Sequence, residues 1–278
     1  MGTTLKARVM CSLASTALAY TVIGLPAQAA EPGAPTGCDS PPRAGGAEVV
    51  DEFVAELESD GASDVAIDQQ LANELCLVRI DNGGYSTEPP VGFQAKSSSS
   101  AVTVTPPSIY WDNGAQRYYA ISSWDMSRAA FMGDVNVGCN WENTGGTDGF
   151  GTSFSANLIL TGYSTTAFKT GGGSWNVANA DTANARGVGY RFQDQARYNC
   201  AETPSPSQIN VDEGQQVISF KKSGTCKTVY GFAKYGHSWA SSSINGVGVG
   251  PYSVSFSWTN QDYGWSAASQ PGGTATVC

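Results

Sequence analysis

The sequence predicts a mostly β protein, with an antiparallel β-sandwich or jelly-roll-like body that follows a small αα-hairpin and is stapled by disulfides. Two observations carry this prediction. From residue 101 onward, apolar residues alternate with Ser, Thr and Gly, and Gly- and Asn-rich turns separate the runs. Before that point, apolar residues recur at helical spacing between acidic ones.

Two short helices are expected between residues 49 and 75. The apolar face of the first consists of Val49, Val50, Phe53, Val54 and Leu57, and that of the second of Ile67, Leu71 and Leu75. Gly61 is the expected stop of the first helix, and Ser63 or Asp64 can cap the second. A hairpin of this size buries too little apolar surface to be stable alone.

Several segments of the body alternate with the period of a strand. The clearest is 252–259, where Tyr252, Val254, Phe256 and Trp258 are interleaved with Ser and Thr, which predicts a half-buried strand with one wet face. Similar runs cover 150–160 and 188–192. At 229–234 both phases are apolar, so a strand covered on both sides is expected there. Together, roughly eight to ten short strands favour a sandwich or jelly roll.

The chain divides into four predicted segments. These are a signal peptide at 1–29, an N-terminal helical hairpin segment at 30–80, a linker at 81–100 and a β-sandwich domain at 101–278. Lys6 and Arg8 precede an apolar run, and small residues end it, which predicts cleavage between Ala29 and Ala30. The linker contains Gly, Pro and Ser tracts. Whether the helical segment is a removable pro-segment stays open.

Six cysteines follow the predicted signal peptide: Cys38, Cys76, Cys139, Cys200, Cys226 and Cys278. An even set in an exported chain predicts disulfides and an extracellular location. Their spacing does not decide the pairing. Cys38 and Cys76 flank the helical hairpin and could staple it, and Cys226 is a reasonable partner for Cys278.

The charge balance excludes some partners. The chain has 24 acidic and 15 basic residues, and its basic residues are scattered. This opposes nucleic acid and anionic lipid as ligands, because both require clustered Lys and Arg. After the signal peptide no apolar run is long enough to predict a stable membrane anchor.

Histidine limits the chemistry further. His237 is the only histidine, which excludes zinc sites built from several imidazoles. The run from Gly236 to Ala240 is similar to a nucleophile elbow, but that motif needs a helix after the turn and a histidine downstream of the serine. His237 is therefore interpreted as a polar residue on a β-turn or strand edge, and no catalytic residue is predicted with it.

Carboxylates offer two alternative interpretations. Glu142 and Asp148 fall in one Gly-rich segment, interpreted as a loop, and could form the acid pair of a glycosidase. Oxygen ligands for calcium could come from Asp112-Asn113-Gly114, from Asp148-Gly149 and from the stretch 176–184. Turn chemistry explains the same residues, so no cofactor is predicted and calcium remains an alternative.

Two tryptophans give the leading functional hypothesis. Trp141 and Trp175 lie in Gly/Asn-rich sequence that reads as loop, and Asn176 follows the second. An exposed indole can pack on the apolar face of a sugar ring while amides bind its hydroxyls. We therefore expect a secreted, non-catalytic protein that binds a glycan or cell-surface polymer. The alternatives are an extracellular polysaccharide hydrolase that uses carboxylates, and a structural surface protein or membrane-active toxin.

Overall fold

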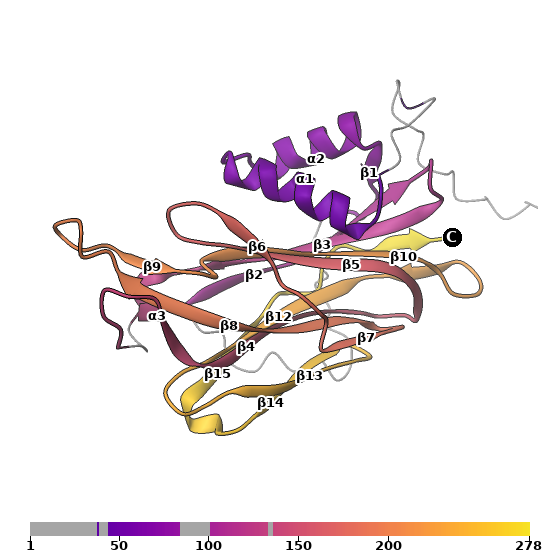
Figure 1. Cartoon of the computed structure of the whole chain (residues 1–278). Coiled ribbons are helices and arrows are strands. Elements are labelled where there is room, and N and C mark those ends of the chain that lie inside the picture. Colours follow the sequence, from indigo (N-terminus) through magenta and orange to yellow (C-terminus); the bar gives the residue numbers. More distant parts are fainter. Residues whose placement is uncertain (1–37, 39–43, 84–100, 133–135) are drawn as a thin grey trace, which may run out of the picture. The chain divides into compact units, whose positions relative to one another are not determined.

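The computed structural model describes residues 38, 44–83, 101–132 and 136–278. The predicted signal peptide with its cleavage site at Ala29 and Ala30 lies outside these residues, as does most of the predicted linker. Every pair of neighbouring strands in the described part is antiparallel, and two helices precede the two large sheets (Figure 1). The predicted fold class is therefore confirmed.

Two large sheets form the body. Sheet A contains, in spatial order, β1 (Leu77–Arg79), β2 (Val102–Asp112), β3 (Arg117–Met126), β10 (Glu213–Lys222), β5 (Leu158–Phe168) and β6 (Ser174–Asn176). Sheet B contains β15 (Gly264–Ala268), β12 (Gly231–Ser238), β4 (Glu142–Phe154), β8 (Gly187–Tyr198) and β7 (Thr182–Asn184), and β9 (Ser207–Ile209) also pairs with β8.

Smaller elements complete the fold. Two further antiparallel pairs are β13 (Ile244–Gly250) with β14 (Ser253–Trp258), and β11 (Lys227–Val229) with β16 (Ala275–Val277). The helices are α1 (Ala47–Ser59), α2 (Asp64–Glu74), the short α3 (Arg128–Met132) and the 3-10 turn η1 (Gln261–Tyr263).

The two large sheets face each other across an aromatic core. Trp124 on β3 is 1% exposed, and its ring centroid lies 4.7 Å from that of Phe150 and 5.6 Å from that of Phe192, both in sheet B. A Cβ at Gly214 would lie 2.1 Å from the Trp124 ring, so only glycine fits beneath the indole. This contact between the sheets makes the body a sandwich.

Both outer faces of the sandwich are covered. The helices lie on sheet A, and the β13–β14 hairpin lies on sheet B (Figure 1). The apolar layer under the helices consists of Val50, Val54, Ile67, Leu71, Leu77, Tyr110, Tyr119 and Val217. Under the hairpin, Phe232 of β12 packs with Ile244, Val247 and Val254. The predicted covering on both sides of residues 229–234 is confirmed for β12, since Ala233 packs in the core between the sheets, but Val229 belongs to β11 and not to the same strand.

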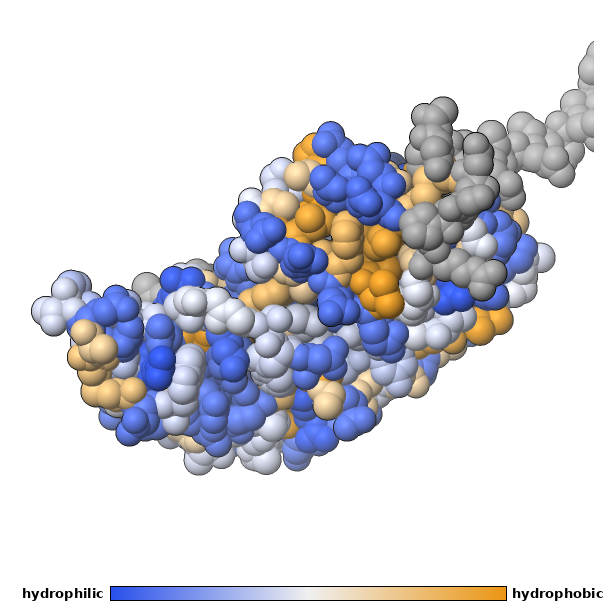
Figure 2. All heavy atoms as spheres, turned by 45° about the horizontal axis from the view of Figure 1, so that its top comes forward, coloured by the Kyte–Doolittle hydropathy of each residue, from blue (hydrophilic) through white to orange (hydrophobic). Residues whose placement is uncertain are grey.

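The helical hairpin forms largely as its sequence predicts. Gly61 follows α1 with a φ of 76°, a value that glycine adopts without strain. The Ser63 hydroxyl accepts a hydrogen bond of 3.4 Å from the amide of Ala66 and so caps α2. Val49 is 45% exposed, so its assignment to the buried face was wrong. Figure 2 shows an apolar area of the surface beside these helices, on a face that is otherwise largely hydrophilic.

The alternating run at 150–160 is two strands, and the expectation of one continuous strand was wrong. β4 ends at Phe154 and β5 begins at Leu158. The Ser155 hydroxyl accepts a hydrogen bond of 3.1 Å from the amide of Tyr230, and the Leu158 amide donates to the Ala185 carbonyl at 2.8 Å. These bonds fix a connection that carries the chain from sheet B to sheet A.

Three disulfides link the described cysteines. They join Cys38 to Cys76, Cys139 to Cys200 and Cys226 to Cys278. The first and third are the pairings that position along the chain had suggested. Such bonds are typical of proteins that fold outside the cytosol. Within the described part of the chain, no helix has the length and apolar character needed to cross a bilayer.

The last turn of α1 carries a carboxyl group with an unusual titration. Burial, followed by the charges of Glu213, Asp51 and Asp64, raises the pKa of Glu58 to about 8. Because the folded-state pKa lies above the unfolded one, Glu58 contributes stability at acid pH that is lost as the pH rises towards 8.

We expect Glu58→Gln to flatten this pH dependence. The variant should be more stable than the parent by on the order of 1 kcal/mol at pH 8.5 and no more stable at pH 4.5. Guanidinium unfolding at the two pH values measures the difference. Glu52→Gln, an exposed position on the same helix, is the matched control and should change neither value. An equal increase in the free energy of unfolding of Glu58→Gln at both pH values would contradict the prediction.

Candidate functional site

Trp141 and Trp175 line the same hollow, although they are far apart in the sequence. The hollow has a volume of about 380 Å³, and its other lining residues are Lys169, Gln193, Gln195 and Asn210. Two indole rings therefore meet three carboxamides and one ammonium group. This is the combination of apolar plates and hydrogen-bonding groups that small-ligand sites use.

The fold brings these residues together where sheet A and sheet B meet at one edge. Trp175 is the central residue of β6, the last strand of sheet A, and Trp141 immediately precedes β4 of sheet B. Gln193 and Gln195 are alternate residues of β8 and so lie on one face of that strand. The expectation that Trp175 lies in a loop was wrong, since it belongs to a short edge strand.

Contacts with the body hold both indoles in place. The Trp175 Nε1–H donates to the Asn210 carbonyl at 3.0 Å, and its ring meets Phe192 edge-on with centroids 6.5 Å apart. The guanidinium carbon of Arg197 lies 4.8 Å from the centroid of Trp141, a cation–π distance. Both tryptophans remain partly exposed, so the site offers two rings whose positions are set before a ligand arrives.

The carboxamides are held by their nitrogens. Gln193 Nε2 donates to the Gly146 carbonyl at 2.9 Å, and Gln195 Nε2 donates to Asn143 Oδ1 at 2.9 Å. Amide oxygens held in this way can accept hydrogen bonds from ligand hydroxyls. Asn210 is held by its side-chain oxygen, since Asn210 Oδ1 accepts a hydrogen bond of 2.6 Å from the backbone N–H of Gln195.

Asn176 lies apart from this hollow. It lines a second one of about 800 Å³, between α1 and the strands β6 and β10, and its Nδ2 donates to Ser164 Oγ at 2.9 Å. Trp175 contributes to both hollows. The second hollow is rich in carboxylates: Glu48, Asp51, Glu52, Glu56, Glu58, Asp212 and Glu213. Of the three predicted ligand-binding residues, Trp141 and Trp175 therefore line one hollow, and Asn176 lines the neighbouring one.

Glu142 and Asp148 do not face each other across a cleft. Both belong to β4, not to a loop, and roughly 15–20 Å of strand separates them at about 3.3 Å per residue. Glu142 is exposed, whereas Asp148 is 0% exposed. The two carboxyl groups of a glycosidase lie within about 10 Å of each other across the scissile bond. This geometry does not support the alternative catalytic pair.

The oxygen-rich segments considered for calcium serve turns and strand contacts. Asp112 Oδ1 accepts from the Ala115 amide at 2.9 Å, which is turn chemistry. Asp181 forms an ion pair with Arg191, and its Oδ2 accepts from the Val247 amide at 2.7 Å. The oxygens named here already have protein partners, whereas Asp112 Oδ2 is buried without a hydrogen-bond partner among the described residues. The remaining candidate, Asp148, belongs to a buried cluster.

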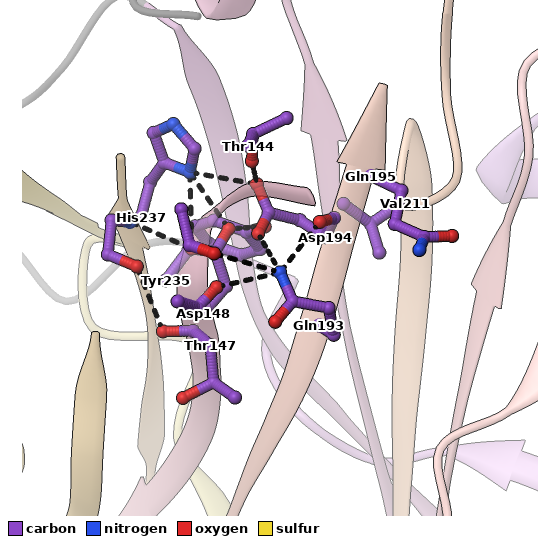
Figure 3. A network of polar contacts seen from close by, with 12 residues as sticks. Thr144, Thr147, Asp148, Gln193, Asp194, Gln195, Val211, Tyr235 and His237 are labelled. Carbon is purple, nitrogen blue, oxygen red and sulfur yellow. Dashed lines mark hydrogen bonds and ion pairs between the residues drawn. The ribbon is translucent and has the colours of Figure 1, made fainter. Parts of the chain in front are cut away.

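Sequence reasoning did not consider Asp194 in that cluster, and it did not bring Asp148 and His237 together. Asp148, Asp194 and His237 meet between the sheets (Figure 3), so the assignment of His237 to a turn or strand edge was wrong. The signal was present in the alternation: Asp148 is in phase with Phe150, and His237 with Tyr235, both core residues. A charged residue in the apolar phase of a strand indicates a buried polar contact.

No protein-family model matches the chain, and neither a curated protein nor a solved structure matches it. A function must therefore be argued from the site itself, because sandwich folds carry many unrelated functions.

Proposed function

We propose that this is a secreted, non-catalytic β-sandwich protein that binds a glycan or a cell-surface polymer in the hollow between Trp141 and Trp175. The observation that carries the proposal is the convergence of these two indoles on one hollow with Gln193, Gln195 and Asn210. Without that convergence, either tryptophan would be an ordinary cap at the end of a sandwich.

The chemistry of the hollow suits a sugar. A pyranose has an apolar face of C–H groups and a rim of hydroxyls, so it needs a flat ring for the first and amides for the second. Anchored indoles and held amides lose little conformational entropy when a ligand binds. The formal net charge of −9 favours neutral or cationic polymers over anionic ones.

A pull-down on insoluble polysaccharides tests the proposal. The oxidised protein, without the predicted signal peptide, is incubated with chitin, cellulose or peptidoglycan, and both the bound fraction and the sugar released into the supernatant are measured. Retention without release supports a binding protein. Release of sugar would replace it with the hydrolase alternative, and neither retention nor release on any polymer would reject glycan binding as stated.

Trp175→Ala is expected to weaken retention at least tenfold, since a central aromatic anchor commonly supplies 1.4 kcal/mol or more, equivalent to about a factor of ten. Trp141→Ala should behave similarly. Tyr263→Ala is the matched control, because Tyr263 is an aromatic residue 43% exposed outside the hollow. Binding isotherms on the retaining polymer measure the effect. If all three variants bind like the parent, the ligand does not occupy this hollow.

A further inference from the structure

Three titratable side chains meet in the dry interior of the sandwich, apart from the glycan hollow. Asp148 on β4, Asp194 on β8 and His237 on β12 are each 0% exposed. One ligand atom from each lies within 4.8 Å of the others, and Figure 3 shows the imidazole directed at the two carboxylates. We propose that this cluster binds one divalent cation of the Zn²⁺ class, as a structural site that ties three strands of sheet B together.

The distances within the cluster fit ligands that share one ion. His237 Nδ1 lies 3.1 and 3.0 Å from the two oxygens of Asp148 and 3.5 Å from Asp194 Oδ2. Two ligands that are each about 2.1 Å from an ion, at an angle of about 90–110°, lie about 3.0–3.4 Å apart. One imidazole nitrogen and carboxylate oxygens are ligand types that Zn²⁺ accepts.

The net negative charge of the cluster also favours the binding of a cation. Two carboxylates and one imidazole carry a net negative charge when the carboxylates are ionised, even if the imidazole is protonated. Among the described residues, His237 is the only basic group that pairs with either carboxylate. An uncompensated charge in a dry interior is costly. A divalent ion with a neutral imidazole would make the cluster electrically neutral.

A proton is the competing explanation. One Nδ1–H can satisfy one carboxylate well, so the second must then carry a proton of its own. In accordance with this, burial and the neighbouring Asp148 raise the pKa of Asp194 well above its usual value. The cluster is therefore either metal-bound or proton-bound, and the two states differ in composition.

A second layer of donors already orients the carboxylates. The Tyr235 hydroxyl donates to Asp148 Oδ2 at 2.7 Å, and the Ser238 amide donates to Asp148 Oδ1 at 2.8 Å. The Thr144 hydroxyl donates to Asp194 Oδ2, and Gln193 Nε2 donates to its Oδ1 at 3.4 Å. Outer partners of this kind hold metal-binding carboxylates in place in structural sites.

Aromatic rings fix the imidazole in the same way. The ring of His237 lies 4.5 Å from that of Phe131 and 5.1 Å from that of Trp265, measured between centroids. The cluster therefore has donors on its carboxylates and packing around its imidazole. Because it is closed to solvent, an ion would enter while the chain folds.

The experiment uses refolding, since loading is expected at that step. The oxidised protein is unfolded in guanidinium chloride with a chelator and without reductant, and is freed of chelator. It is then refolded with one equivalent of Zn²⁺, Mn²⁺ or Ca²⁺, or in fresh chelator. After desalting, metal content is measured by mass spectrometry and the melting temperature by calorimetry. We expect close to one Zn²⁺ per chain and a melting temperature at least about 5 °C higher than in chelator.

Two variants locate the ion. Asp194→Asn should retain less than about one tenth of an equivalent of Zn²⁺, because it removes one anionic ligand. Asp51→Asn is the control, since Asp51 is also buried but bonds Ser164 and Thr166 under α1, and it should retain a full equivalent. If Asp194→Asn does not fold, the visible spectrum of Co²⁺-loaded parent protein reports whether the ion is four-coordinate.

Three results would overturn the proposal. One is parent protein that retains none of the ions and melts at the same temperature with and without chelator, which would show that the cluster is proton-bound. Another is Asp194→Asn that retains as much Zn²⁺ as the parent. The third is a Co²⁺ spectrum of a hydrated ion. None of these measurements depends on glycan binding.

Discussion

Asp148→Asn is expected to destabilise the folded protein by about 3–5 kcal/mol, the cost of removing one member of a buried charged group. Asp148 accepts hydrogen bonds from the Tyr235 hydroxyl and the Ser238 amide. An asparagine presents an NH₂ group to some of these donors, so at least one buried donor loses its acceptor. The effect is expected whether a metal ion or a proton completes the cluster, because Asp148 is the acceptor in both cases.

Guanidinium unfolding at pH 7 measures this loss. Asp181→Asn is the comparison, since Asp181 forms an ion pair with Arg191 at a side chain 18% exposed. Removing that charge should cost about 1 kcal/mol or less. If the two variants lose the same stability, the buried cluster has no special role in holding β4, β8 and β12.

The double variant Cys38→Ser/Cys76→Ser is expected to lose about 4 kcal/mol, the loop-closure estimate for a sequence separation of 38 residues. The loss should concentrate in the helices. They contact sheet A through one apolar layer and through Asp51, which Ser164, Thr166 and Gln215 bond. Without the disulfide, these noncovalent contacts alone must offset the conformational entropy lost in ordering both helices.

Hydrogen exchange resolves where the protection is lost. Amides of α1 and α2 should exchange much faster in the double variant, while those of β4 and β8 stay protected. Cys139→Ser/Cys200→Ser is the control, because it removes a bond close to Trp141 and should leave the helices protected. A uniform loss of protection over helices and strands would show that the helices and the sandwich unfold as one unit.

The strands and helices could be predicted because each depends on local periodicity. The repeat from Val50 to Leu57 gives α1, and the alternation at Val254 and Phe256 gives β14. The turn between Phe154 and Leu158 escaped prediction because the alternation continues in phase across it. Only the switch from one sheet to the other, which depends on distant partners, reveals the break.

In the candidate site, too, the sequence predicted the local features but not the contacts between distant residues. The Gly/Asn-rich surroundings of Trp141 and Trp175 indicated partly exposed rings, but not that the two would meet, since this needs the edge of sheet A to lie against β8. The buried cluster was missed for another reason. Asp148 precedes a Gly, which favoured a turn, and its phase with Phe150 was given less weight than its charge.

The covered faces of the sandwich limit where a ligand can act. With helices on one sheet and a hairpin on the other, the positions open to variation gather at the edge, in the segments that carry Trp141 and Trp175. Exposed positions in those segments, such as Asn140 and Ser174, can change in sequence without disturbing the buried layers. Randomising Asn140, Trp141 and Ser174 would therefore give a library of binding proteins on a constant scaffold. Gly171, Gly172 and Gly173 must be kept, because their φ values of 84°, 103° and 91° favour glycine.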